Sequence, residues 1–126
     1  MIIESLFSSK NYQASKKLLD AATLRHEGLA TNLANVETPG YKRVDLPKTF
    51  AAEFAARMRA GTIATAAMPK LTEDLAATSQ RKDGNNVELD KELLALGKNV
   101  SEYDTLTEFV SGSLKQLRLA ITGRTT

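Results

Sequence analysis

A helical pattern that ends in a proline–glycine turn constrains this chain more than any other stretch of its sequence. Leu29, Leu33 and Val36 recur at spacings of four and three residues, which places their side chains on one face of a helix. Pro39 has no N–H to donate to a helical ladder, and Gly40 suits the positive φ of a type II turn. The sequence therefore predicts a helix that runs into this stretch and a chain that leaves it in a new direction.

The same spacing continues towards the N-terminus and predicts one long helix. The pattern lasts for nearly four heptads, so we assign residues 1–36 to an N-terminal helix in which residues 1–8 form an apolar lead. His26 falls on this pattern, where a packed or partly exposed imidazole is the expected state. The positions expected to pack are Tyr12, Leu19, Leu29, Leu33 and Val36.

A second heptad pattern, longer than four heptads, predicts a C-terminal helix over residues 87–122. A turn at residues 83–86 precedes it, so Asn85 or Asn86 is expected to cap the helix, with Glu88 completing a capping box. The positions expected to pack are Leu93, Leu96, Val100, Tyr103, Val110, Leu114 and Leu117. Three further apolar residues widen this stripe, so the helix is expected to contact more than one neighbour: Leu94, Leu106 and Phe109.

The segment between the helices, residues 37–86, reads as the turn followed by an irregular insert. We expect an extended stretch at residues 41–50, a short helix at residues 51–60 closed by Gly61, and either short strand segments or a mobile loop at residues 61–82. The fold class that follows is mainly α, in one domain over residues 1–126 with a tail at 123–126. Its two long terminal helices pair as an antiparallel coiled coil around an irregular, short-strand insert. Two helices alone leave apolar surface uncovered, so such a chain should complete itself against copies or relatives.

Composition argues against most kinds of chemistry. The chain has no cysteine and one histidine, which removes disulfide chemistry and the usual zinc ligand sets. Glycine-rich phosphate loops are missing, and a formal charge of +2 gives little support to nucleic-acid binding. No apolar stretch has the length of a membrane span, and the start lacks the pattern of a cleaved signal peptide. We therefore do not expect an enzyme, and we expect no catalytic residue, metal, cofactor, small-molecule ligand or nucleic acid.

Two blocks of sequence resemble one bacterial family. The run LATNLANVETPGYKR, at residues 29–43, is similar to the N-terminal signature of the flagellar rod and hook proteins. The block DGNNVELDKELLALGKNVSEYDTLTEF, at residues 83–109, resembles the proximal rod members of that family. Pro47, and Leu93 where the family often has methionine, depart from the pattern. On the matching motif, the resemblance implies an assembly role for Asn32, Asn35, Thr38, Pro39, Gly40 and Tyr41.

The resemblance also implies a function. It implies a structural subunit of the proximal rod of the flagellar basal body, exported through the flagellar type III apparatus without a cleaved signal. The subunit would form homo-oligomers within a periplasmic helical tube by coiled-coil packing of its terminal helices. Its partners would be other rod proteins, the MS-ring or rod adaptor proteins, and the export gate. The alternative is a cytoplasmic helical chaperone or adaptor for flagellar export, which would not need the asparagine-rich turn.

Overall fold

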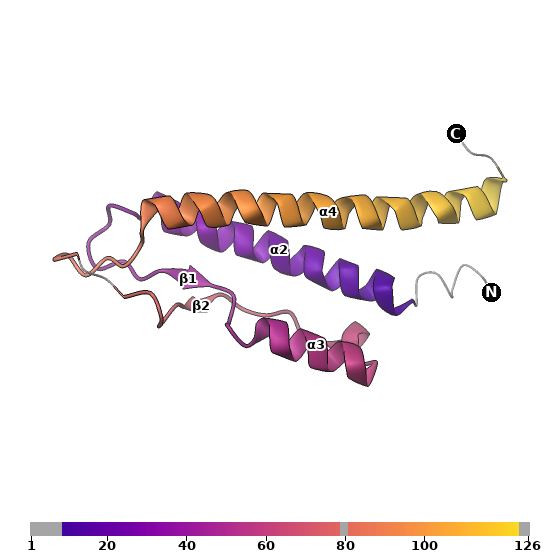
Figure 1. The fold of residues 1–126 in the computed structure, drawn as a ribbon, viewed down its shortest axis with the longest axis horizontal. Helices are drawn as coiled ribbons and strands as arrows, with labels where there is room; N and C mark the ends of the chain where they lie inside the picture. Colours follow the sequence, from indigo (N-terminus) through magenta and orange to yellow (C-terminus); the bar gives the residue numbers. More distant parts are fainter. Residues whose placement is uncertain (1–8, 79–80, 124–126) are drawn as a thin grey trace.

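The computed structural model describes residues 9–78 and 81–123 and is mainly helical (Figure 1). Its elements are α2 (Lys10–Ala34), β1 (Val44–Asp45), α3 (Phe50–Ala60), the 3-10 helix η1 (Ile63–Thr65), β2 (Thr72–Glu73) and α4 (Leu89–Thr122). The mainly α class is therefore confirmed. The predicted short helix closed by Gly61 is present as α3. The apolar lead and the last three residues of the predicted tail lie outside the described residues.

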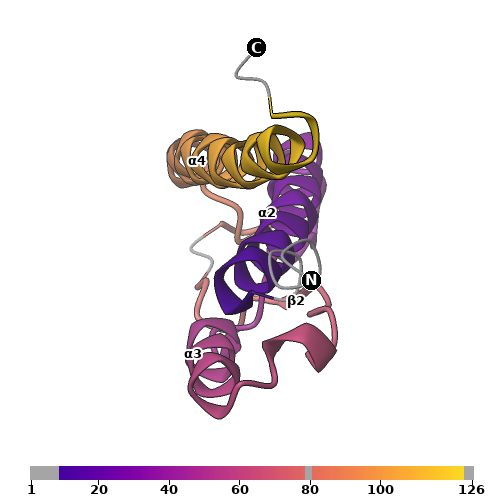
Figure 2. The same cartoon turned by 90° about the vertical axis from the view of Figure 1, so that its right-hand side faces the viewer.

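The two long helices lie side by side and run antiparallel, and the insert packs on the side of α2 that faces away from α4 (Figures 1 and 2). β1 and β2 pair antiparallel, with Val44 opposite Glu73 and Asp45 opposite Thr72. The molecule thus has three layers, in the order α4, α2 and insert. Helix α2 is the middle layer, and its end positions the turn that follows.

The ends of α2 follow the sequence closely. Ser9 is the N-cap, and its hydroxyl accepts a hydrogen bond from the backbone N–H of Tyr12 at 3.2 Å. The helix ends at Ala34, after which the backbone N–H of Tyr41 donates to the carbonyl of Thr38 at 3.2 Å. Gly40 lies at φ 73°, so the expected turn with a left-handed glycine is present.

The predicted cap of α4 is wrong. Its N-cap residue is Glu88, which makes no side-chain capping hydrogen bond. The side chain of Asn85 instead reaches the end of α2, and Asn86 bonds to the backbone of Arg43 and Ala77. Each side-chain amide makes more hydrogen bonds in these tertiary contacts than it would make as the cap of α4.

The interior of the described chain is thin and unusually polar. Its buried hydrophobic residues are Ala14, Ala21, Ala22, Leu29, Ile63 and Val87. Its buried polar residues are Asn32, Asn85, Asn86, Glu92 and Asn99. Small alanines let α2 and α4 approach closely, and Asn99 donates across the contact to the carbonyl of Ala22 at 2.9 Å.

The contact face of α4 is displaced from the predicted apolar seam. Glu92 and Asn99, which lie one heptad apart, are the buried residues of α4. The predicted positions Leu96, Val110 and Leu117 are half-buried. Four other predicted positions are exposed: Leu93, Val100, Tyr103 and Leu114. A coiled coil between the two helices through the predicted seam is therefore not observed, because buried polar groups, and not the apolar heptad, set how α4 faces α2.

On α2, the predicted packing positions lie closer to the interior. Leu29 is fully buried. The other four are half-buried: Tyr12, Leu19, Leu33 and Val36. Among the described residues, no helix combines the length and apolarity that crossing a membrane requires.

Candidate assembly site at the end of the first helix

Asn32 joins four segments of the molecule through one buried amide. Its Nδ2 donates to the carbonyl of Val44 at 2.8 Å and to Oε2 of Glu92 at 3.1 Å. Its Oδ1 accepts from the backbone N–H of Val44 at 2.9 Å and from the hydroxyl of Tyr41 at 3.0 Å. An asparagine amide has two donors and two acceptor lone pairs, so these bonds use its full capacity. The motif asparagine thereby ties α2 to the turn, to β1 and to α4.

Arg43 is surrounded by three carboxylates. Its Nε binds Glu92 on α4, its Nη1 binds Asp74 at 2.8 Å, and its Nη2 binds Asp45 at 3.0 Å. We call Asn32, Arg43, Asp45, Asp74 and Glu92 the polar clasp. Two further cations balance its charge, since Arg25 binds Asp45 at 3.0 Å and Lys48 lies 3.6 Å from Asp74. Together with these two cations, the polar clasp is close to electrically neutral.

Burial and neighbouring groups together shift the pKa of three side chains in and beside the polar clasp. Burial disfavours the charged form of Arg43, yet its pKa is raised because Glu92 and Asp45 bind the guanidinium. Burial also opposes ionisation of Asp74, but its pKa is lowered by the backbone N–H of Ala76, Lys48 and Arg43. Burial and the negative charge of Glu92 raise the pKa of the Tyr41 phenol. At neutral pH the arginine is therefore charged, Asp74 is ionised and Tyr41 is a neutral hydrogen-bond donor.

Asn85 fastens the second sequence block to the turn. Its Nδ2 donates to the carbonyls of Asn35, Val36 and Thr38 at 2.9, 3.0 and 2.9 Å. These carbonyls follow the end of α2 and have no helical partner of their own. The backbone N–H of Gly40 donates to the carbonyl of Asp83 at 2.8 Å. The two blocks, residues 29–43 and 83–109, thus meet in space.

The remaining motif residues act locally. Asn35 is the C-cap of α2, and its Nδ2 donates to the carbonyl of Thr31 at 2.8 Å. The Thr38 hydroxyl donates to Oδ1 of Asn35 at 3.1 Å. Pro39 and Gly40 are exposed at the tip. These residues shape the exit of the chain from α2, while Asn32 and Tyr41 connect it to the polar clasp.

The arrangement positions backbone and offers little for catalysis. Every buried side-chain nitrogen or oxygen in the described residues has a hydrogen-bond partner. No group of three or more metal-ligating side chains lies together in residues 9–78 and 81–123. From the sequence, Glu92 is expected to be part of an acidic first turn of the helix, and Arg43 part of a basic pair that is solvated or faces neighbouring subunits. The sequence alone predicts no role for Asp45 or Asp74. Arg43 and Glu92 lie within the two sequence blocks that resemble the rod family, and this is the sequence feature that could have pointed to a role for them.

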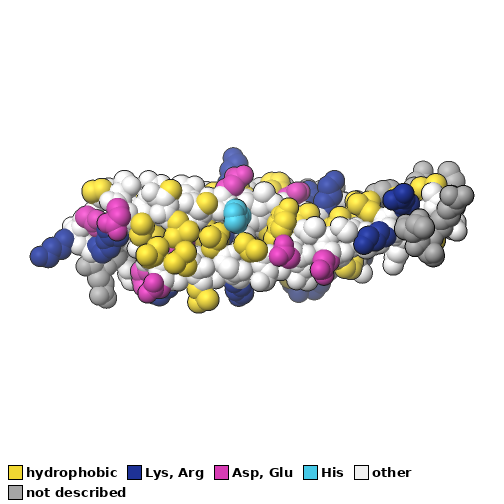
Figure 3. Space-filling model, turned by 90° about the horizontal axis from the view of Figure 1, so that it is seen from above, with side chains coloured by type: hydrophobic (Ala, Val, Ile, Leu, Met, Phe, Trp, Pro, Cys, Tyr) yellow, Lys and Arg dark blue, Asp and Glu magenta, His cyan; other side chains and the backbone are white. Residues whose placement is uncertain are grey.

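One face of α4 carries the surface of most interest for assembly. Five residues of the heptad pattern are exposed and form what we call the α4 stripe: Leu89 at 49%, Leu93 at 52%, Val100 at 42%, Tyr103 at 39% and Leu114 at 45%. Viewed from the α4 side, the molecule shows hydrophobic side chains gathered in patches along its length (Figure 3). These positions of the heptad pattern thus face outwards.

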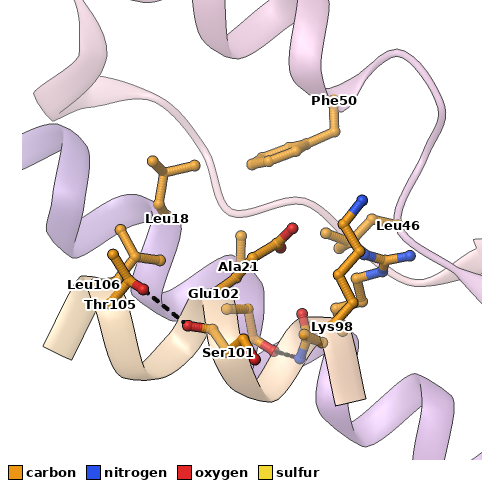
Figure 4. A pocket seen from close by; sticks show the side chains of 12 residues that line it. Leu18, Ala21, Leu46, Phe50, Lys98, Ser101, Glu102, Thr105 and Leu106 are labelled. Carbon is orange, nitrogen blue, oxygen red and sulfur yellow. Dashed lines mark hydrogen bonds between the residues drawn. The ribbon is translucent and has the colours of Figure 1, made fainter. Parts of the chain in front are cut away.

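A cavity of about 560 Å³ lies where α2, α4 and the insert meet. Phe50 and Leu46 of the insert point into it from one side, opposite Leu18 and Ala21 of α2 and Leu106 of α4 (Figure 4). The insert therefore covers one flank of the helix pair, although its packing there is loose.

Comparison with known proteins identifies the family. No protein-family model matches the chain. It is 34% identical over 117 residues to the flagellar basal body rod protein FlgB of Aquifex aeolicus (strain VF5), covering 86% of this chain and 90% of that protein. It is 30% identical over 130 residues to FlgB of Bacillus subtilis (strain 168), covering 94% and 98%. It is 28% identical over 132 residues to FlgB of Escherichia coli (strain K12), covering 90% and 93%. The chain therefore belongs to the FlgB family of flagellar basal body rod proteins.

Proposed function

We propose that this chain is a structural subunit of the proximal rod of the bacterial flagellar basal body. The observation that carries the proposal is the α4 stripe, a heptad-spaced apolar surface left exposed in a chain whose own core is thin. Exposed contiguous apolar surface is typical of protein–protein interfaces, and heptad spacing suits a partner helix. The names of the relatives agree with this role.

In this proposal the polar clasp and the stripe have separate tasks. The clasp fixes how the turn leaves α2 and how α4 lies against it, through Asn32, Arg43 and Glu92. The stripe then packs against helices of neighbouring subunits, both copies of this chain and other rod proteins, within a helical tube. The packing positions named from the sequence on α2 and α4, other than the fully buried Leu29, are proposed to contribute to these contacts. The rod end formed in this way would link to the MS-ring and the export gate.

The thin core also suits the proposed route of delivery. A chain with few buried hydrophobic residues gains little from folding alone and is stabilised by its neighbours. Such a subunit can pass through the flagellar type III export channel unfolded and complete its packing on arrival in the periplasm. The proposed role is structural, with no catalytic step.

Mass spectrometry of purified basal bodies tests the proposal. Basal bodies would be isolated with detergent from the source bacterium, beside a strain from which the chain has been deleted. We expect a few copies of the chain per particle, and loss of the more distal rod proteins in the deletion strain. Recovery of the chain only from the cytosolic fraction would instead support an export chaperone and reject a rod subunit.

A further inference from the structure

The two flanks of the α2–α4 pair differ, and the flank away from the insert carries an open groove. A hollow of about 280 Å³ is lined there by Thr23 and His26 of α2 and by Val100 and Tyr103 of α4. Asn99 lines both this hollow and the larger cavity under Phe50, so the two lie on opposite sides of the helix contact. Val100 and Tyr103 belong to the α4 stripe, which continues the groove along α4.

The rim of this groove is mainly acidic, with one lysine, Lys16, four residues before Asp20 on the same face of α2. On α2, Asp20 and Glu27 lie three residues before and four after Thr23, which places them on the same helix face. On α4, Asp104 lies four residues after Val100, and Glu108 a further four. All four carboxylates are exposed, and none forms an ion pair with the rest of the described chain. Figure 3 shows acidic side chains flanking the apolar patches beside the histidine, with Lys and Arg side chains at both ends of the molecule and along its edges.

The end of α4 projects beyond α2. The hydrogen bonds from Asn32 to Glu92 and from Asn99 to Ala22 set the antiparallel register, which brings Lys10, the first residue of α2, level with about residues 111–114 of α4. Residues 115–121 therefore extend past α2, as Figure 1 shows. Leu119 and Ile121 in this overhang are 40% and 62% exposed, and Lys115 and Arg118 make it basic.

We propose that the overhang of one copy, residues 115–121, docks in the acidic-rimmed groove of a second copy. Ile121, together with Leu117 one turn before it on the same helix face, would cover the apolar floor at Val100 and Tyr103. Lys115 and Arg118 would lie against the acidic rim. This contact rests on the proposed rod function and names the surfaces that join one copy to the next.

Charge also argues against the main alternative, two α4 stripes packed on each other about a two-fold axis. That pairing would bring the central acidic residues of both copies together, namely Glu102, Asp104 and Glu108. The overhang and the groove, by contrast, are different surfaces with opposite charge. A contact between different surfaces is head-to-tail, so it leaves each end free for another copy and builds an open helical array.

Engineered cysteines test the contact, because the chain has no cysteine of its own. The variant carries Thr23→Cys in the groove and Ala120→Cys in the overhang. Within one chain these positions are roughly 30 Å apart along the helix pair, far beyond disulfide range, so any bond joins two copies. The matched control pairs Ala120→Cys with Ala52→Cys, an exposed position on α3. Each variant would replace the native chain in the source bacterium, and its basal bodies would be oxidised mildly and run on non-reducing gels.

We expect disulfide-linked dimers and larger oligomers from the variant with Thr23→Cys and Ala120→Cys. Their yield should be at least tenfold higher than that from the control with Ala52→Cys and Ala120→Cys. Adding Lys115→Glu and Arg118→Glu should lower this yield about tenfold, and adding Asp20→Lys and Glu27→Lys to that variant should restore it. Equal cross-linking of the two pairs, or none from the Thr23 pair while the chain is present in basal bodies, would reject this contact and leave the rod role standing. Absence of the native chain from basal bodies would reject the rod role itself.

Discussion

Polar side chains occupy interior positions that hydrophobic residues fill in most helix pairs. Asn32, Asn85, Asn86 and Asn99 are buried in the described chain together with Glu92, and each has hydrogen-bond partners. A buried polar group contributes modestly when paired and is costly when its partner is removed. Single substitutions in the polar clasp should therefore destabilise the protein mainly because they leave a partner group buried without its hydrogen bond or counter-charge.

Replacing Arg43 should be the most damaging change in the polar clasp. Arg43→Leu leaves Glu92, whose side chain is 1% exposed, without its counter-charge, and also releases Asp74 and Asp45. Breaking a buried pair in this way lowers the free energy of unfolding by about 3 kcal/mol. Urea unfolding of the native chain and of the Arg43→Leu variant measures this difference in the free energy of unfolding. Arg59→Leu, at an exposed position on α3, is the control and should change stability by less than about 0.5 kcal/mol.

Asn85 should stabilise the end of α2, not the start of α4. Asn85→Ala removes one of the donors to each of the carbonyls of Asn35, Val36 and Thr38 and leaves the buried N–H of Val87 without its acceptor, at a cost of about 1–3 kcal/mol. Hydrogen exchange should then lose protection at residues 35–41. Loss confined to the first turn of α4 would show that the capping role expected from the sequence is the correct one.

Gly40 should be required for its backbone conformation alone. A Cβ at this position would meet no atom within 4 Å, but φ is 73°, where side chains other than glycine are strained. Gly40→Val should cost about 1–2 kcal/mol or more and prevent assembly into the rod, whereas Gly40→Asn should be tolerated better. Recovery of the valine variant in basal bodies at the native level would show that assembly does not require the left-handed conformation at Gly40.

At the scale of the element, α4 has two faces with different tasks. Its polar face contacts α2 through Glu92 and Asn99, and the α4 stripe faces outwards. A helix that is apolar on more than one side needs more than one neighbour. Stability of the monomer and competence to assemble should therefore be separable by substitution.

Charges on the α4 stripe should affect assembly without unfolding the monomer. Leu93 and Leu114 are 52% and 45% exposed, so Leu93→Asp with Leu114→Asp should change the free energy of unfolding by less than about 1 kcal/mol. The same variant should be absent from purified basal bodies. Leu75→Asp, at an exposed position outside α4, is the matched control and should assemble normally. Normal assembly of the stripe variant would place the subunit contacts elsewhere.

At the scale of the whole molecule, the polar clasp joins all three layers and should make stability depend on pH at both extremes. The folded state lowers the pKa of Asp74 below its usual 3.8, so the stability that it contributes is complete above that value and is lost as pH falls below it. The folded state raises the pKa of Tyr41 above its usual 10.0, so the stability linked to the neutral phenol is complete below pH 10 and declines above it.

Unfolding measured from pH 2 to 11 should show a plateau between these two limits. Asp74→Asn should flatten the acid decline, and Tyr41→Phe the alkaline one, although the latter also loses the hydrogen bond to Asn32. Unchanged slopes in both variants would mean that other groups govern the pH dependence.

The sequence alone determined the local structure and the family. The 3-4 spacing predicted the helix that the structure shows as α2, the heptad pattern predicted α4, and the Pro39–Gly40 pair predicted the turn. These features depend on interactions between residues a few positions apart, so they can be predicted from the sequence.

Only the tertiary structure decided which face of α4 meets α2 and what Asn85 does. Apolar spacing shows that a face will be covered, but it does not say whether the chain itself or a neighbour covers it. Arg43, Asp45, Asp74 and Glu92 lie up to 49 residues apart in sequence, and they become one site only when the folded backbone brings them together. Buried amides and ion pairs gain their energy from specific distant partners, which no local pattern specifies.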